Sequence, residues 1–198
     1  EIQRGNLSAF IPTNLISITD GQIMLDTDLF NQGVKPAVQI GLSVSRVGGA
    51  AQTKAMKQVA GELRLELSQY EEVSRFARFG TDVDEATQQQ INKGERLLAM
   101  LVQPPHEPLS LIAQISILLA AKEGYLNSIP VKRISEFENN LFKFLTQEYD
   151  ELMDHIEHSR ELNEDTYERL SNAIEVFLEE WNERTKTYEK NGHGNYST

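Results

Sequence analysis

The sequence predicts a mostly helical α+β fold, with a few strands near the N-terminus and a helical bundle after them. Residues 7–47 are rich in β-branched and alternating apolar residues, which is the pattern of strands. From residue 50 onward, apolar residues recur at steps of three and four, which is the pattern of amphipathic helices. Hydrophobic residues make up 39% of the 198 positions, which is sufficient for a core in one domain or in two small ones.

Turn signals divide the strand-rich part. An Asp-Gly pair at residues 20–21 separates residues 15–19 from residues 22–25, and such a pair between two apolar runs predicts a β-hairpin. A further turn and strand are expected over residues 35–45. Because two or three strands do not make an independent sheet, we expect this part to belong to a larger domain.

Residues 41–52 indicate the end of a buried strand, a turn that contains glycine, and the start of a helix. Apolar residues alternate with serines up to residue 45, and Gly48 and Gly49 supply conformational freedom for the turn. Arg46 then lies at the carboxyl end of the strand, where α/β proteins bind ligands. A guanidinium there can present a planar, permanent charge to a phosphate. The alternative is an ordinary surface arginine that closes a strand.

Apolar stripes and helix breakers divide the rest of the chain. The first helical stripe runs from Met56 to Tyr70, and Thr81 or Asp82 can cap the next helix, residues 85–100. Two prolines at positions 104 and 105 force a break. Three further helices are expected: a buried apolar helix over residues 109–122, a helix that starts near Pro130 and carries Phe137, Leu141, Phe144, Leu145, Leu152 and Ile156, and a last helix with Leu170, Ile174, Phe177, Leu178 and Trp181. We interpret the stripes as core positions.

The composition excludes several classes of function. The formal net charge is −11, and residues 101–198 carry 18 acidic against 9 basic residues, which argues against nonspecific binding to nucleic acid or to anionic membranes. The longest strictly apolar run, residues 117–121, is too short to span a bilayer, and no N-terminal stretch has the pattern of a signal peptide. Any membrane association is therefore expected to run through partners. The absence of cysteine excludes disulfides and thiolate metal sites, and it fits a reducing compartment.

Motifs for independent catalysis are not found. The sequence contains no Gly-x-x-x-x-Gly-Lys-Ser/Thr loop, so the chain is not expected to hold nucleotide phosphates by that loop on its own. His155 and His158 are spaced as a weak metal pair, but the neighbouring carboxylates favour a solvated helix face instead, and no metal site is predicted.

Three segments carry a family resemblance. Residues 11–23 read IPTNLISITDGQI, residues 29–37 read LFNQGVKPA, and residues 43–61 read SVSRVGGAAQTKAMKQVAG. In this order and spacing, they resemble the alpha subunit of the F-type ATP synthase family, densely up to about residue 96 and more thinly afterwards. The resemblance implies three regions: residues 1–50 as the C-terminal strands of a P-loop-type nucleotide-binding domain, residues 51–190 as a C-terminal helical bundle, and residues 191–198 as a flexible tail.

The resemblance also implies catalytic roles for three residues. Arg46 matches the arginine finger that alpha lends to the catalytic site of the neighbouring beta subunit, where it would stabilise charge on the transferring phosphoryl group. Ser43 matches a position that the family needs for activity, and it would hold the strand of the arginine by packing and hydrogen bonding. Ser17 matches an interface serine near the phosphate end of that site.

Four residues match the adenine pocket of alpha's own non-catalytic nucleotide site. They are Phe30, Lys35, Pro36 and Gln103. An aromatic ring and a proline offer apolar faces to a purine, and the glutamine can hydrogen-bond its edge. The lysine stands where the family usually has arginine, and Pro105 stands where a second glutamine is common, so we expect adenine to be held less firmly. The implied ligand is ATP or ADP with Mg, whose metal ligands and phosphate loop would lie outside this chain.

The function implied by the resemblance is a share in proton-coupled ATP synthesis, in a chain that is not active alone. The implied partners are beta subunits, an N-terminal alpha polypeptide that carries the phosphate loop, the central stalk and the peripheral stalk. Residues 80–84, which run from Gly80 to Asp84, are the expected contact with the central stalk, and helix capping by the two aspartates is the alternative. The missing phosphate loop predicts a split or processed subunit, or else a truncated chain.

A rival interpretation is a non-catalytic helical protein that serves interaction or assembly only. The expected location is the matrix side of the mitochondrial inner membrane, as a peripheral part of a complex. The plastid thylakoid and the bacterial plasma membrane are the alternatives.

Overall fold

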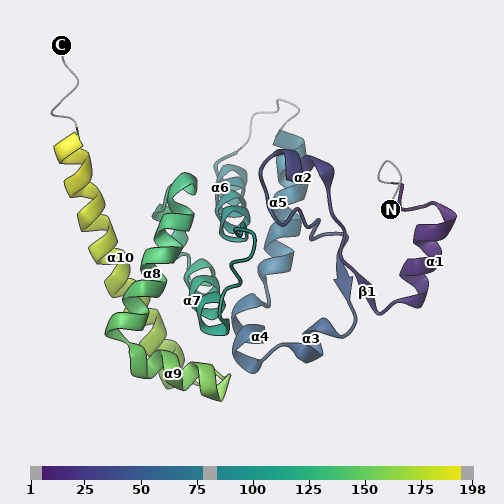
Figure 1. The fold of residues 1–198 in the computed structure, drawn as a ribbon. Coiled ribbons are helices and arrows are strands. Elements are labelled where there is room, and N and C mark those ends of the chain that lie inside the picture. The colour runs from purple at the N-terminus through teal and green to yellow at the C-terminus, as the bar shows by residue number, and fades with distance from the viewer. Residues whose placement is uncertain (1–5, 78–83, 193–198) are drawn as a thin grey trace, which may run out of the picture. The chain divides into compact units, whose positions relative to one another are not determined.

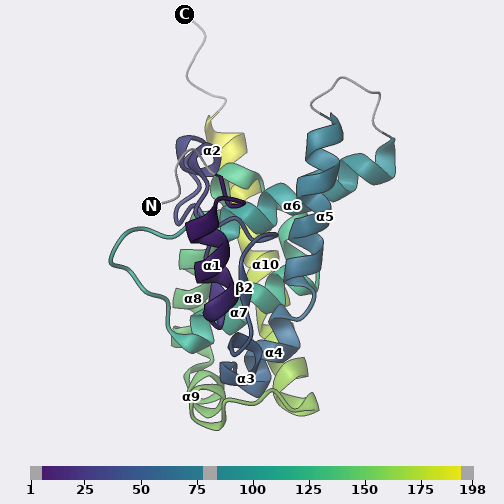
Figure 2. The same cartoon turned by 90° about the vertical axis from the view of Figure 1, so that its right-hand side faces the viewer.

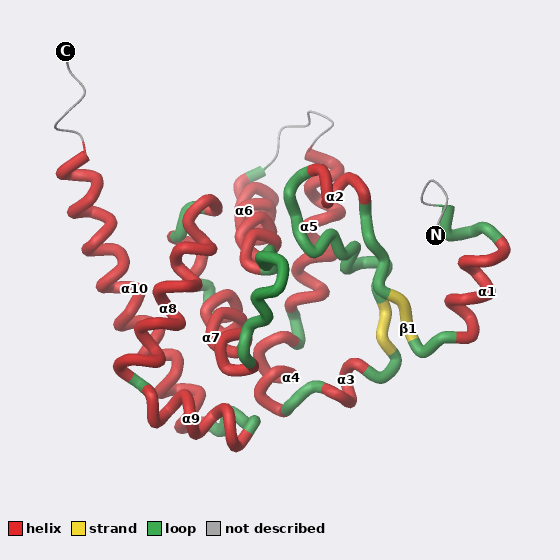
Figure 3. The backbone as a smooth tube through the Cα atoms, in the orientation of Figure 1, coloured by secondary structure: helices red, strands yellow, loops and turns green. Residues whose placement is uncertain are grey.

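A computed structural model describes residues 6–77 and 84–192, with side chains up to residue 186 (Figure 1). By its internal contacts the chain divides into two compact units, an N-terminal unit, Glu1–Pro108, and a C-terminal unit, Leu109–Thr198. Helices dominate both units in the described residues, and the two strands are two residues long each (Figure 3). The mostly helical fold is therefore confirmed. Among the described residues, none of the helices combines the length and the apolar character that a membrane crossing requires.

The N-terminal unit has short elements first and a helix pair last. In order, its elements are α1 (Phe10–Ile18), β1 (Gly21–Gln22), α2 (Thr27–Asn31), β2 (Val44–Ser45), α3 (Gly48–Ala51), α4 (Lys54–Ala60), α5 (Leu63–Ala77) and α6 (Glu85–Met100). β1 pairs with β2 in antiparallel fashion, with Gly21 opposite Ser45. α5 and α6 lie side by side in both views (Figures 1 and 2), and Gly94 gives the Tyr70 ring room to pack on the backbone of α6.

The predicted hairpin at residues 15–25 is wrong, because its first half is helical. α1 covers residues 10–18, and Thr19 closes it by donating both its N–H (3.1 Å) and its hydroxyl (2.9 Å) to the carbonyl of Leu15. The Asp-Gly signal is local and does not distinguish a hairpin turn from a helix end followed by a strand. Pro12, in the first turn of the helix, was the available signal for a helix start.

The strand that follows pairs far along the chain, and Gly21 makes that pairing possible. A Cβ atom at this position would overlap the carbonyl oxygen of Val44, so only glycine lets the two backbones approach. The Gly48-Gly49 pair behaves differently from the prediction. It starts the short helix α3 without a positive φ at either residue, because the hydroxyl of Ser45 accepts the N–H of Gly48 at 2.8 Å and closes the turn.

The helix α6 begins and ends where the sequence predicted, and Asp84, one of the two aspartates given as alternative caps, caps it. The carboxylate of Asp84 accepts the N–H of Thr87 at 2.7 Å, which satisfies one of the free amides of the first turn. Hydrogen bonding to the side chain of Thr87, with the backbone N–H of Thr87 second, holds the pKa of Asp84 below its usual range. Thr81, Asp82 and the rest of the predicted stalk contact up to Val83 lie outside the described residues.

The C-terminal unit is a helical bundle around α7. Its elements are α7 (Leu111–Lys122), the 3₁₀ turns η2 (Tyr125–Ser128) and η3 (Val131–Arg133), α8 (Ile134–Glu148), α9 (Asp150–Ser159) and α10 (Glu164–Gly192). Nine of the twelve residues of α7 are buried, because α8, α9, α10 and η2 all pack against it. The predicted tail from residue 193 onward lies outside the described residues.

The predicted apolar stripes form the core of this bundle. Phe137 on α8 lies edge-on to Phe177 and Trp181 of α10, with ring centroids 5.2 and 5.4 Å apart. Leu178 is only partly buried, unlike its neighbours in the stripe. The long helix expected up to Ile156 is broken at Tyr149, whose backbone leaves the helical region (φ −131°, ψ 32°), so the stripe continues on α9 instead.

Candidate functional site

Arg46 lies immediately after β2 in the N-terminal unit. Its backbone N–H donates to the carbonyl of Asp20 at 2.8 Å, which fixes the end of the strand to the residue before β1. Its side chain is exposed, and it makes no hydrogen bond or ion pair with any residue in the described ranges 6–77 and 84–192. The structure thus presents a guanidinium with all its donors available at the carboxyl end of a strand.

Ser43 ties the segment before Arg46 to the segment after β1. Its hydroxyl donates to the carbonyl of Gln39 at 2.7 Å and accepts the N–H of Met24 at 3.0 Å. Gln39 in turn donates its own N–H to the carbonyl of Met24 at 2.8 Å. The serine therefore closes a corner between two chain segments, which is a geometry that can hold the strand of the arginine.

Ser17 lies in a different element from Ser43 and Arg46. It lies on α1 rather than on a strand, and its exposed hydroxyl donates to the carbonyl of Asn14 at 2.7 Å, one turn back in the same helix. No hydrogen bond in the described residues joins it to Ser43 or Arg46.

The four residues predicted to line an adenine pocket are brought close together. Phe30 on α2 is more than half exposed, and the ammonium of Lys35 lies 4.7 Å from the centroid of its ring. Gln103, beyond α6, donates its N–H to the carbonyl of Lys35 at 2.8 Å, and Pro36 is the next residue in the chain. The backbone of Gln103 is therefore tied to the turn that carries Lys35 and Pro36, and the Lys35 ammonium lies over the ring of Phe30.

The turn that carries Phe30 is held by its own hydrogen bonds. Asp26 caps α2 by accepting the N–H of Leu29 at 2.9 Å, and Gly33 has a positive φ of 87° as the chain leaves the helix. Gly33 then lets Val34 donate its N–H back to the carbonyl of Leu29. The ring of Phe30 therefore stands on a short helix that is fixed at both ends.

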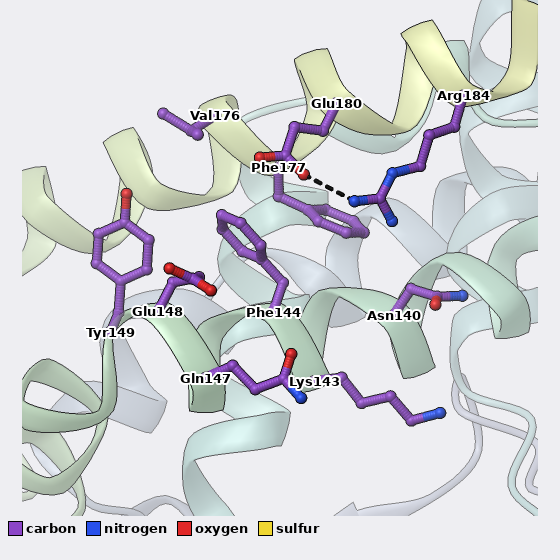
Figure 4. A pocket seen from close by; sticks show the side chains of 10 residues that line it. All are labelled: Asn140, Lys143, Phe144, Gln147, Glu148, Tyr149, Val176, Phe177, Glu180 and Arg184. Atoms are coloured by element: carbon purple, nitrogen blue, oxygen red, sulfur yellow. Dashed lines mark hydrogen bonds and ion pairs between the residues drawn. The ribbon is translucent and has the colours of Figure 1, made fainter. Parts of the chain in front are cut away.

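A separate hollow of about 640 Å³ lies between α8 and α10 of the C-terminal unit (Figure 4). Figure 4 shows Phe144 and Phe177 pointing toward one another in it, with ring centroids 5.4 Å apart. Glu180 and Arg184, one turn apart on α10, form an ion pair at 3.1 Å. The two rings contact one another, and the two charged groups form an ion pair. The lining residues include no nucleophile beside a base, so we assign the hollow no catalytic role.

Metal ligation finds no support in the described part of the chain. No three side chains of histidine, cysteine, aspartate or glutamate are grouped there as a metal ion would require. His155 and His158 are both exposed on α9, and Nδ1 of His158 is 2.7 Å from the carbonyl oxygen of Asp154, to which it donates.

Comparison with known proteins gives family matches on both sides of Arg46. The family described as ATP synthase alpha/beta chain, C terminal domain, matches residues 52–177. The family described as ATP synthase alpha/beta family, nucleotide-binding domain, matches residues 1–45. Of the predicted site residues, Ser17, Ser43 and three of the four adenine-pocket residues fall within the second match.

Bacterial relatives are similar over most of this chain. The ATP synthase subunit alpha of Petrotoga mobilis is 50% identical over 178 residues, which is 90% of this chain and 35% of that protein. The same subunit of Wolinella succinogenes is 49% identical over 177 residues (89% and 35%), and that of Aquifex aeolicus is 48% identical over 181 residues (91% and 36%). The chain therefore spans about a third of the length of these relatives.

Proposed function

This chain belongs to the ATP synthase alpha/beta family, and on that premise we propose that it is the part of an alpha subunit that supplies an arginine in trans to a beta subunit. In this proposal the complex couples ATP synthesis to proton flow, and the catalytic nucleotide is bound by the beta subunit. The chain alone is not an active enzyme.

The observation that carries the proposal is the state of Arg46. A structural arginine usually gives its guanidinium to a carboxylate or a carbonyl, whereas this one is exposed and unpaired in the described residues while its backbone is fixed. A permanent planar charge with free donors suits the equatorial oxygens of a phosphoryl group during transfer. Such an arginine is worth roughly 10³–10⁵ in rate, or about 4–7 kcal/mol of activation free energy.

The two serines have different roles in this proposal. Ser43 positions the strand of the arginine through its bonds to Met24 and Gln39. Ser17 contributes to the interface with the beta subunit, and its place on the exposed face of α1 is compatible with that role.

A second candidate function is a non-catalytic adenine-nucleotide site on the same chain. The convergence of Phe30, Lys35, Pro36 and Gln103 supports it. Because the lysine ammonium lies over the phenylalanine ring, a purine that stacks there must displace it, which agrees with a site that holds adenine weakly. The nucleotide would be ATP or ADP with Mg, and we assign the metal ligands and the phosphate loop to another polypeptide.

Exposed apolar side chains support a chain that works inside an assembly. In the N-terminal unit Phe10, Ile18, Ile23 and Leu25 are each more than 70% exposed, and surfaces of this kind are covered by other protein. We assign that cover to the N-terminal alpha polypeptide with the phosphate loop and to the beta subunit. The central stalk, the peripheral stalk and the bacterial plasma membrane complete the proposed setting, since the relatives named above are bacterial and not mitochondrial.

The test is steady-state ATP hydrolysis by the assembled complex. Arg46→Ala should lower kcat by roughly 10³-fold or more and change KM much less, because the arginine acts on the transition state. Arg46→Lys should lower kcat less, since lysine keeps the charge and loses the planar fork. Arg64→Ala, an exposed arginine on α5, is the matched control. A near-normal kcat for Arg46→Ala in a fully assembled complex would contradict the catalytic role and favour the interpretation that the chain serves assembly only.

A further inference from the structure

Gln39 is the residue through which the segment of Arg46 reaches α5. Its backbone carbonyl accepts both the N–H (3.0 Å) and the hydroxyl (2.7 Å) of Ser43, and its N–H donates to Met24. Its side-chain amide points the other way and donates to Oε2 of Glu71, on α5, at 3.4 Å. Gln39 thus joins the corner that Ser43 closes to α5. The contact is at Glu71, more than one turn from either end of that helix.

The contact with α5 is close on the backbone side as well. A Cβ atom built at Gly41 would lie 3.2 Å from Oε2 of Glu71, so the backbone at Gly41 passes close to the carboxylate. Two hollows, of about 730 and 240 Å³, meet at Gln39, Glu71 and Arg75. Because hollows adjoin the contact, the loop is held to α5 at this point rather than by continuous packing.

Glu71 is an unusual choice for a mere packing position. The side chain is partly buried, and burial raises the pKa of its carboxyl group, with a further contribution from Asp26 and an opposing one from Arg75. A carboxylate retained there at some cost in stability suggests that its acceptor oxygens are needed.

We propose that Glu71 is a positioning residue: by holding Gln39 on α5, it fixes the corner closed by Ser43 and so the strand that presents Arg46. β1 and β2 are only two residues long, so the sheet alone gives this strand little support. The assignment rests on the proposed function of Arg46. It also means that a displacement of α5 is transmitted to the arginine through Gln39.

The first arm of the test is amide hydrogen exchange in the full chain, which does not depend on catalysis. Glu71→Leu keeps the approximate size and removes the acceptor, and it should speed exchange at Ser43 and Met24 about tenfold. Glu71→Gln keeps an acceptor oxygen and should leave exchange unchanged, as should Glu72→Leu, an exposed glutamate on the same helix. Unchanged exchange in Glu71→Leu would overturn the proposed contact.

The second arm is kcat and KM for ATP hydrolysis by the assembled complex. Glu71→Leu should lower kcat roughly threefold to tenfold with little change in KM, and Glu71→Gln should restore it. In the Arg46→Lys background, Glu71→Leu should cause no comparable further loss, because it acts through the guanidinium fork. An equal loss in both backgrounds, or a loss that Glu71→Gln shares, would overturn the positioning role. If Arg46→Ala itself keeps full activity, the proposed function fails. Hydrogen exchange then still tests whether Glu71 holds Gln39.

Discussion

The two compact units bury their apolar residues to very different extents. In the C-terminal unit Phe137 is fully buried, and most of α7 is hidden beneath the surrounding helices. In the N-terminal unit Phe10 is 81% exposed, and no residue of α1 is buried although its sequence is strongly apolar. The bundle buries its apolar residues among its own helices, whereas the unit that carries Arg46 leaves the apolar side chains of α1 exposed.

This difference separates stability from function in the molecule. An isolated helix of nine residues is marginal in water, so α1 needs packing that the described residues do not give it. The residues assigned to nucleotide chemistry all belong to the N-terminal unit, whose two strands are two residues long and whose segments around Met24 and Gln39 are joined mainly by hydrogen bonds. Under the proposed function, the bundle is the more stable unit by itself, and partner subunits complete the surroundings of the arginine-bearing segment.

The largest expected effect on stability comes from removing a buried ring in the bundle. Phe137→Ala should lower the free energy of unfolding by about 3–5 kcal/mol, because it leaves a cavity beside Phe177 and Trp181. Phe10→Ala, the same change on an exposed side chain, should stay within about 0.5 kcal/mol. The measurement is chemical denaturation of the full chain. Equal costs for the two variants would break the contrast between the units.

The helices were predictable because their signals are local and repeated. The stripes from Phe137 to Trp181 form the bundle core, and α6 occupies residues 85–100 as its pattern indicated. The errors arose where a single residue determines the end of a helix. Tyr149 breaks the helix inside a continuous apolar stripe, and of the caps considered for α6 it is Asp84, not Thr81 or Asp82, that accepts the N–H of Thr87. Periodicity predicts which face of a helix is buried, but it does not determine at which residue the helix begins or ends.

The part of the candidate site that could be predicted is the part formed by residues close to Arg46 in the sequence. The position of Arg46 after a strand was recognised from alternation, but that strand is exposed and two residues long, whereas a buried strand was predicted. The adenine-pocket residues came from a family resemblance. The contact between Gln39 and Glu71 could not be predicted, because 32 positions separate the two residues and neither belongs to a sequence motif. The strand partner of β1 was missed for the same reason, because pairing between distant segments depends on the fold.

A smaller effect is expected from pH, and it sharpens the comparison within the bundle. Burial raises the pKa of Glu138 to about 7, so the folded state disfavours ionisation that the unfolded chain permits. Stability from this group is present below pH 4.5 and is lost as pH rises toward 7. Glu138→Gln should therefore gain on the order of 1 kcal/mol over the wild type at pH 8, after allowance for partial exposure, and little at pH 4.

Glu136, two residues earlier, provides the opposite sign as a control. Arg133 holds the pKa of its carboxyl group below the usual range, so its contribution is present at neutral pH and is lost as pH falls. Glu136→Gln should therefore be slightly destabilising at pH 8 and neutral at low pH. Denaturation of both variants at pH 4 and pH 8 makes the comparison, and pH-independent differences would show that burial of Glu138 is not the cause.

The most direct test of the central claim is binding of a transition-state analogue to the assembled complex. ADP with aluminium fluoride imitates the planar phosphoryl group, and an arginine that acts during transfer should favour it over ADP alone. We expect Arg46→Ala to weaken binding of the analogue by roughly 10³-fold while ADP affinity changes less than about threefold. Equal affinity for the analogue in the wild type and in Arg46→Ala would contradict the account, because the guanidinium would then have no part in the transition state.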